Sequence, residues 1–350
     1  MRIKLLLIIC FFDYICANAN NQQENMPYTH GLLWKISGNG LHKPSYLFGT
    51  YHAKGGMQIL DSISGIEELL LSTNALICES EFEISEIIKP VKTKNQSELN
   101  SNLKPWPNAD STYNNLLNAK QKFVLDSIFN SNNTLKGIKL LNLRPLSLWS
   151  YMKYYNKLNQ VKPESNVSKV DNSANNSKKV EVLDSYLQLL AKKNNINIIE
   201  LEPKNSMQKI EVALSNEQPV MSYKNEIDIL LNYLVNQTKI ALISKEMANK
   251  VLSAYLLQDI AYLITKQEDE HCLNENLGQL GLEVERNRNN AYRRVVDDRN
   301  DDWMTKIPSM IKNKSSFITV GAGHLGGEKG LIKQLRKLGY VVENITKISH

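Results

Sequence analysis

Cysteine, histidine and long apolar segments are scarce in this 350-residue chain. Two of the four cysteines, Cys10 and Cys16, lie near the N-terminus, and the remaining Cys78 and Cys272 are too few for a disulfide framework or a zinc ligand set. Beyond the first residues, no apolar run approaches the roughly 20 residues of a membrane-spanning helix. The formal net charge is +6, and the lysines alternate with Asn and Ser instead of aromatic residues. We therefore expect no nucleic-acid groove and no membrane span in the mature protein.

The N-terminus has the three parts of a secretory signal. A basic start precedes the apolar run from Leu5 to Cys16, and the small-residue stretch Ala17-Asn18-Ala19 follows it. Asp13 interrupts the apolar run, so an uncleaved anchor is the alternative interpretation. We predict that residues 1–19 are a signal peptide, that residues 20–31 are flexible, and that the mature protein is periplasmic or secreted.

The first part of the chain has the pattern of an α/β protein. Strand-like residues 32–36 and 45–48 flank the Gly-rich turn 37–40, which predicts a hairpin. Residues 63–71 have helical spacing, and the short apolar run 75–78 follows them. This order of strand, helix and strand favours parallel pairing in a mixed sheet.

The middle of the chain is predicted to be mostly helical, and the C-terminal part returns to alternating strands and helices. Residues 159–180 are rich in Lys, Asn and Ser and contain too little apolar surface to offset the entropy of ordering, so we predict a disordered insertion there. We expect one domain over residues 32–348. The expected helices are 116–129, 183–193, 227–237, 245–266 and 331–338, and the expected strands are 196–201, 317–320 and 340–345.

Two segments share one layout, in which a strand runs directly into Gly-x-x-His. Residues 46–48 lead into Gly49-Thr50-Tyr51-His52, and residues 317–320 lead into Gly321-Ala322-Gly323-His324. Each motif places a His just past the carboxyl end of a strand, where ligands usually bind in α/β sheets. The chain has only six His, so two in matching positions predict a divalent metal site for Mn, Co or Zn. The alternative is that each His is merely a hydrogen-bonded core residue.

The second motif also matches a dinucleotide-binding pattern. Gly321, Gly323 and Gly326 form G-x-G-x-x-G between a strand and a helix, and Glu343 lies 20 residues after Gly323. The chain ends seven residues after Glu343, which leaves no room for the rest of a nucleotide-binding half. We therefore favour the metal interpretation over this one.

Four segments, in the same order along the chain, resemble the TraB/GumN family. They are the opening Leu33-Trp34-Lys35-Ile36 with Ser45 to His52, the central Leu201-Glu202-Pro203 with Gln208, the element Asp298-Arg299-Asn300-Asp301-Asp302-Trp303 with Ile307, and the ending Phe317 to Ile332 with Leu338 to Val342. The resemblance implies an α/β fold with a mixed central sheet and two related βα halves, which the family shares with the Tiki metalloproteases.

In those proteins the paired Gly-x-x-His motifs, an acidic residue and an Arg-Asn element form a metal-dependent peptidase site. The resemblance therefore implies that His52 and His324 are metal ligands. Glu79 would be a ligand or the general base. Arg299 and Asn300 would bind or polarise the substrate carbonyl.

Two of these assignments have competitors within the sequence. Glu81 lies on the same face as Glu79 if the strand alternation continues. Glu285-Arg286-Asn287 repeats the Arg-Asn signature upstream, although only Arg299-Asn300 is followed by Trp303 at the family's spacing. Glu79 and Arg299 could also form a plain salt bridge.

The leading functional hypothesis is an exported, metal-dependent hydrolase that cleaves a peptide or protein substrate. The first alternative is a non-catalytic periplasmic binding or regulatory protein of the same fold. The second is a metal-free, esterase-like hydrolase in which the two His act as acid and base.

Overall fold

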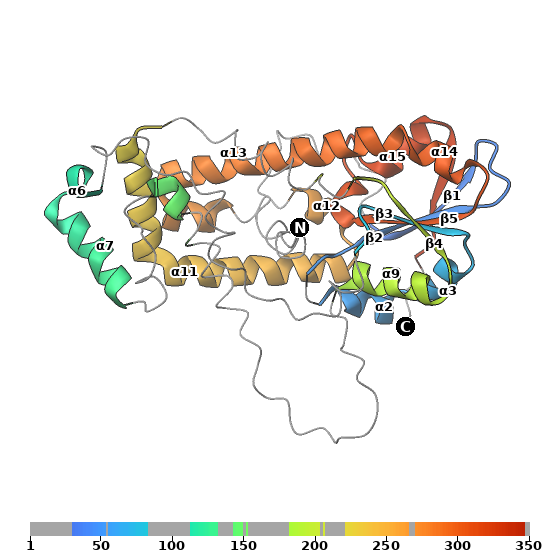
Figure 1. Cartoon of the computed structure of the whole chain (residues 1–350), viewed down its shortest axis with the longest axis horizontal. Coiled ribbons are helices and arrows are strands. Elements are labelled where there is room, and N and C mark those ends of the chain that lie inside the picture. The colour runs from blue at the N-terminus through green and yellow to red at the C-terminus, as the bar shows by residue number, and fades with distance from the viewer. Residues whose placement is uncertain are drawn as a thin grey trace, which may run out of the picture.

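The computed structural model describes residues 30–53, 55–82, 113–131, 143–149, 152, 182–203, 206, 221–265 and 270–346. The predicted signal peptide, almost all of the segment 20–31 and the predicted insertion 159–180 lie outside these residues. A six-stranded sheet occupies one end of the molecule, and long helices extend away from it (Figure 1). None of the helices in the described ranges is both long enough and apolar enough to cross a membrane.

The sheet confirms the predicted α/β class. Its strand order is β4-β3-β5-β2-β1-β6. β1 pairs antiparallel with β2 and β6, whereas β2, β5, β3 and β4 pair in parallel, so every strand except β1 points the same way. The strands are β1 (Leu33–Gly38), β2 (Ser45–Thr50), β3 (Ala75–Cys78), β4 (Asn197–Glu200), β5 (Ser316–Gly321) and β6 (Tyr340–Asn344).

The hairpin β1–β2 and all the other predicted strands are present. β5 is buried at every position, as expected for a central strand of a parallel sheet that is covered on both faces. The helices and 3₁₀ turns are η1 (Gly56–Gln58), α2 (Ile59–Ser62), α3 (Ile66–Leu71), α6 (Tyr113–Leu116), α7 (Ala119–Ser131), α9 (Leu183–Lys193), α11 (Tyr223–Leu256), α12 (Ile260–Thr265), α13 (Glu270–Met304), α14 (Ile307–Lys312), η5 (Ala322–His324) and α15 (Leu331–Lys337).

The helical middle differs from the prediction in two respects. The helix expected over 227–237 and the first part of the one expected over 245–266 form the single helix α11, because no Gly or Pro interrupts the segment between them, and the last part is α12. The break comes later, at Gln258, which has a positive φ of 60° between α11 and α12. The long helix α13 was not among the expected helices. A further correction is smaller: α3 begins at Ile66 instead of residue 63, after Gly65 in the left-handed conformation.

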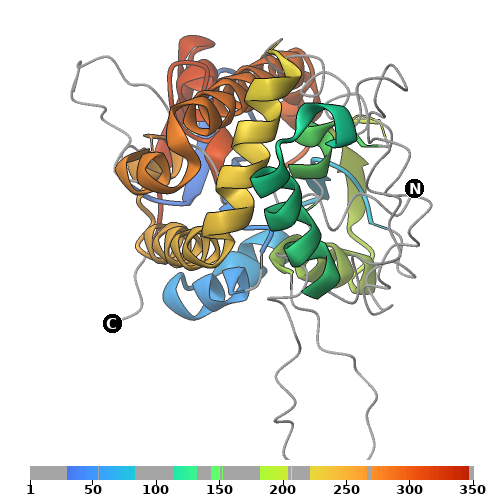
Figure 2. The ribbon, with the colours of Figure 1, turned by 90° about the vertical axis from the view of Figure 1, so that its left-hand side faces the viewer.

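Two hydrophobic cores stabilise the molecule. One surrounds the sheet, and the other lies in a helical arm that α7, α11 and the N-terminal part of α13 form with residues 143–149. α11 and α13 run side by side from the sheet into this arm (Figure 1), and Figure 2 shows α7 packed across α11 at its far end. Glu226, fully buried on α11, pairs with Arg144 and so ties the segment 143–149 to the arm.

The register of the parallel strands determines where the functional side chains meet. Thr50 is paired with Gly321 at the end of β2 and β5, and Cys78 is paired with Thr319 at the end of β3. The two Gly-x-x-His turns and Glu79 therefore leave the sheet at the same edge. Cys78 itself is a free, buried thiol.

The dinucleotide alternative does not agree with this topology. Helix α15 begins only at Leu331, several residues after the Gly-rich turn, and β6 is separated from β5 by β2 and β1. A dinucleotide-binding unit instead has its helix start at the glycines and its two strands adjacent. Glu343 forms an ion pair with Lys35 at 3.7 Å, so its carboxylate is not placed as a ribose-binding group would be.

Candidate functional site

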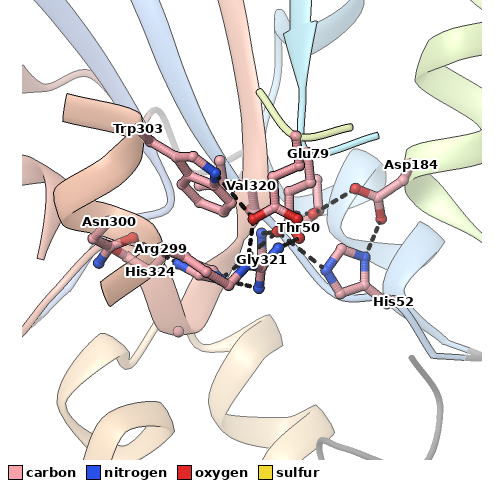
Figure 3. Close-up of polar contacts among 12 residues, drawn as sticks. Thr50, His52, Glu79, Asp184, Arg299, Asn300, Trp303, Val320, Gly321 and His324 are labelled. Carbon is pink, nitrogen blue, oxygen red and sulfur yellow. Dashed lines mark hydrogen bonds and ion pairs between the residues drawn. The ribbon is translucent and has the colours of Figure 1, made fainter. Parts of the chain in front are cut away.

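The side chains of His52, Glu79 and His324 converge at the carboxyl end of the three central strands (Figure 3). Glu79 Oε1 lies 3.7 Å from His52 Nε2 and 3.9 Å from His324 Nε2. Gly321 allows this close approach, because a Cβ on it would lie 2.9 Å from His52 Nε2 and 3.5 Å from Glu79 Oε1. The glycine of the second motif therefore leaves room for the histidine of the first.

Asp184, at the start of α9, fixes the orientation of His52. His52 Nδ1 lies 2.8 Å from Asp184 Oδ2, and the Thr50 hydroxyl donates to Asp184 Oδ1 at 2.8 Å. Burial alone would lower the pKa of His52, but the carboxylates of Asp184 and Glu79 outweigh it and raise the pKa to about 10. His52 is therefore an imidazolium at neutral pH in the metal-free protein, and its Nε2–H faces Glu79.

Glu79 is a partly buried carboxylate, with a side chain 18% exposed, and several N–H donors surround it. Arg299 Nη2 donates to Glu79 Oε2 at 2.5 Å, and the backbone N–H of Gly321 donates to Glu79 Oε1 at 2.7 Å. Burial would raise the pKa of Glu79, but the charge of Arg299 and the His52 imidazolium hold it well below its usual value. Glu79 is thus ionised at any physiological pH.

His324 is held in the opposite protonation state. Its Nδ1 donates to Asn300 Oδ1 at 2.6 Å, which leaves Nε2 to accept from Arg299 Nη1 at 3.1 Å. Burial and the adjacent Arg299 charge lower the pKa of His324 well below 6.5. The ring also packs against Trp303, with 4.4 Å between the ring centroids. The two histidines are therefore a charged and a neutral imidazole that face one carboxylate.

Arg299 and Asn300 both contact His324, but their other contacts differ. Arg299 donates to Glu79, to His324 and, through Nε, to Glu202 at 2.6 Å. The Asn300 amide donates to the backbone oxygens of His324 and Lys329, and its oxygen accepts from His324. Asn300 therefore holds the His324 turn, and only Arg299 reaches the centre of the site.

One face of α9 holds both strand-end segments in place. Asp184 binds His52, and four residues later Gln188 binds the backbone on both sides of Glu81, through Ser80 O at 3.0 Å and Phe82 N at 2.8 Å. Lys192, four residues further on, donates to Phe82 O at 3.0 Å. Spacing of i, i+4 and i+8 places these residues in one row on the helix.

Sequence reasoning did not find Asp184, Thr50 or Gln188, and it gave Glu202 no role. An Asp in the first turn of a predicted helix usually indicates a helix N-terminus. Nothing in the sequence around Asp184 therefore pointed to its contact with His52. Thr50 did lie inside the first Gly-x-x-His motif, where its position directly before the turn was the available signal.

One protein family matches the chain over most of its length. The model of the TraB/PrgY/gumN family matches residues 32–344, which is nearly the whole described chain. The chain belongs to this family. Neither the curated proteins nor the solved structures contain a match to it.

The two competitors for the family's motif residues lie away from the site. Glu81 pairs with Lys192 at 2.8 Å, and its side chain is 37% exposed. Arg286 and Asn287 lie 13 residues before Arg299-Asn300 on α13, about 20 Å along the helix at 1.5 Å per residue. The strand alternation that placed Glu81 beside Glu79 fails because β3 ends at Cys78.

His52, His324 and Glu79 are residue types that bind divalent metals, but the site has two obstacles. Two imidazole Nε2 atoms and one carboxylate oxygen suit Mn, Co or Zn, and each Nδ1 is held by a side-chain oxygen, as is usual for metal-binding His. Among the described residues, no group of three or more His, Cys, Asp or Glu side chains is placed to hold a metal ion. The obstacles are the Nε2 proton of His52 and Arg299, which donates to the lone pair of His324 Nε2 and to Glu79.

Proposed function

We propose that this TraB/PrgY/gumN family protein is an exported hydrolase of peptide bonds that uses a divalent metal. The proposed ligands are His52, His324 and Glu79. One observation carries the proposal: the Nε2 atoms of the two motif histidines face the same oxygen of Glu79 at 3.7 and 3.9 Å. Carboxylate oxygen and neutral imidazole are the ligand types of catalytic hydrolytic centres.

Each side chain has a defined task in this proposal. A bound metal would supply Lewis-acid chemistry, which polarises a carbonyl and acidifies water. Asp184 and Asn300 hold the His52 and His324 rings in place through Nδ1. Arg299 uses three of its five N–H groups within the site, so two remain to bind a substrate carbonyl oxygen. Glu79 accepts a proton from water if it is not itself a ligand.

A metal-free hydrolase is the second candidate, and the protonation states favour it. His52 carries a proton that it can donate to a leaving group, and neutral His324 can accept one, as an acid and a base do in general catalysis. The proton would be accepted at His324 Nε2, so in that case Arg299 Nη1 must leave this nitrogen while Nδ1 keeps donating to Asn300. The two candidates differ in their response to chelators, because only the metal-dependent enzyme loses activity.

The test combines metal content with peptide hydrolysis. The wild-type protein, purified from the periplasm or medium, is analysed for bound metal and assayed on a peptide library with and without EDTA. We expect about one ion per chain, loss of the ion in His52→Ala and His324→Ala, and no change in His42→Ala, whose side chain is exposed in the β1–β2 turn. EDTA-resistant hydrolysis would indicate the metal-free candidate. Bound metal without hydrolysis would indicate a binding protein.

Glu79→Gln separates the two roles of Glu79. A general base would lose activity by roughly 10²- to 10⁴-fold while the metal stays bound, whereas a ligand would lose the metal as well. Glu81→Gln is the matched control, because that carboxylate pairs with Lys192 outside the site.

Export is part of the same proposal. The basic and apolar start and the Ala17-Asn18-Ala19 stretch predict cleavage after Ala19. Mass spectrometry of protein from the native host should find Asn20 as the first residue. An intact Met1 would refute the signal peptide.

A further inference from the structure

Arg299 carries its positive charge where a metal would bind. Its two Nη nitrogens donate to His324 Nε2 and Glu79 Oε2, which are two of the three proposed ligands. A guanidinium and a metal ion cannot both use the same nitrogen lone pair. The site can therefore accept a metal on His324 Nε2 only if Arg299 Nη1 moves away, whereas Nη2 lies on Glu79 Oε2 and not on Oε1, the oxygen that faces the two imidazoles.

Glu202 gives Arg299 a second attachment that does not depend on the ligands. Its Oε1 accepts from Arg299 Nε at 2.6 Å and from Trp303 Nε1 at 3.1 Å. Its side chain is 7% exposed, and its backbone N–H donates to Glu79 O at 3.1 Å. The guanidinium carbon also lies 4.6 Å from the Trp303 ring centroid. Glu202 and Trp303 thus contact the guanidinium through Nε and its face, while the two Nη nitrogens contact His324 and Glu79. Figure 3 shows Arg299 between Trp303 and Glu79.

We propose that Glu202 is a positioning residue, which anchors Arg299 through Nε so that its Nη nitrogens can exchange between the ligands and a substrate. The inference rests on the proposed metal site and extends it. With metal absent, Arg299 neutralises Glu79 and occupies His324. With metal bound, Arg299 stays on Glu202 and Trp303, and the freed Nη groups face the place where a substrate carbonyl is bound.

The anchoring has a direct consequence for metal affinity. Arg299 competes with the metal, so removing its guanidinium strengthens metal binding. The carboxylate of Glu202 forms an ion pair with Arg299. Without that charge, Glu79 and His324 are the remaining polar partners of the guanidinium, so Arg299 stays on them more of the time and metal binding is weaker. If Glu202 acts through Arg299, its effect must disappear when Arg299 is replaced.

The experiment is a double-mutant cycle with Co²⁺ titrated into the full-length, metal-depleted protein by calorimetry. We expect about tenfold tighter Co²⁺ binding in Arg299→Gln and about tenfold weaker binding in Glu202→Gln, within the range of coupling between contacting groups. In the Arg299→Gln background, Glu202→Gln should change Co²⁺ affinity by less than about threefold. Glu81→Gln, a carboxylate that does not contact Arg299, is the control for loss of a negative charge.

The outcomes separate this inference from the proposed function. Equal weakening by Glu202→Gln in both backgrounds would show that its charge acts directly and would overturn the anchoring role, while the metal site stands. No Co²⁺ binding in any variant would overturn both. Arg299→Lys provides a second test if Arg299→Gln does not fold: one ammonium cannot reproduce the three guanidinium contacts, so Co²⁺ binding should again tighten.

Discussion

The charge on His52 makes the stability of the metal-free protein depend on pH in a calculable way. The folded pKa is about 10, against 6.5 for an ordinary His. A folded pKa above the unfolded one stabilises the protein fully below the unfolded pKa, and this contribution is lost as pH rises through the folded pKa. The difference between the folded and unfolded pKa of His52 corresponds to about 5 kcal/mol of folding stability, at about 1.4 kcal/mol per unit of pKa. Of this, about 4 kcal/mol remains at pH 7 and almost none above pH 10.

Asp184→Asn is the perturbation that tests this. Asp184 is the first of the two carboxylates that raise the pKa of His52, and Asn keeps the shape of the side chain and a partner for Thr50. Without it, the pKa of His52 falls back toward 6.5. The stability advantage of the wild-type protein over the variant should therefore shrink by about 3 kcal/mol between pH 7 and pH 10.

Urea unfolding of both proteins in EDTA, at several pH values from 6 to 10.5, measures this difference. Subtracting one protein from the other cancels the contribution of groups that Asp184 does not influence, such as Tyr292, whose pKa is raised to about 12 chiefly by burial. A difference that stays constant from pH 7 to pH 10 would refute the assignment of an imidazolium to His52. The control Asp61→Asn, on α2, should show no such trend.

Three further predictions concern the same site. Gly321→Ala should lower the free energy of unfolding by about 1–3 kcal/mol, because its Cβ would lie 2.9 Å from His52 Nε2. Gly323→Ala is the control, since nothing lies within 4 Å of its Cβ, and urea unfolding compares the two variants. Gln188→Leu should cost about 1–3 kcal/mol in the same assay, because it removes the partners of two backbone groups beside Glu81. Metal binding should release about one proton from His52 at pH 7.5, measured by calorimetry in buffers of different ionisation enthalpy, and affinity should rise about tenfold per pH unit; equal heats in all buffers would contradict this.

The sequence predicted the sheet well because each strand carries its own signal. The apolar runs at β3 and β5 and the turn between β1 and β2 are local patterns. The pairing of β2 with β5, on which the meeting of the two histidines depends, is a long-range contact that only the structure shows. The length of α11 was missed, although no Gly or Pro breaks the helix.

The supporting side chains of the site could not be predicted in the same way. Asp184 and Glu202 lie 132 and 97 residues from their side-chain partners His52 and Arg299, and such contacts follow from tertiary packing alone. The role of Asn300 changed for the same reason, since only the fold shows that its amide binds the His324 turn. Residue type and spacing indicated which groups to expect at the site, whereas the fold showed which groups hold them.

Anomalous diffraction from crystals of the Co²⁺-loaded protein, recorded at the cobalt edge, tests the central claim most directly. The account predicts one peak that lies about 2.0–2.2 Å from both His52 Nε2 and His324 Nε2, with Arg299 moved off His324 and still on Glu202. A peak at another place, or none while Arg299 Nη1 remains on His324 Nε2, would contradict it.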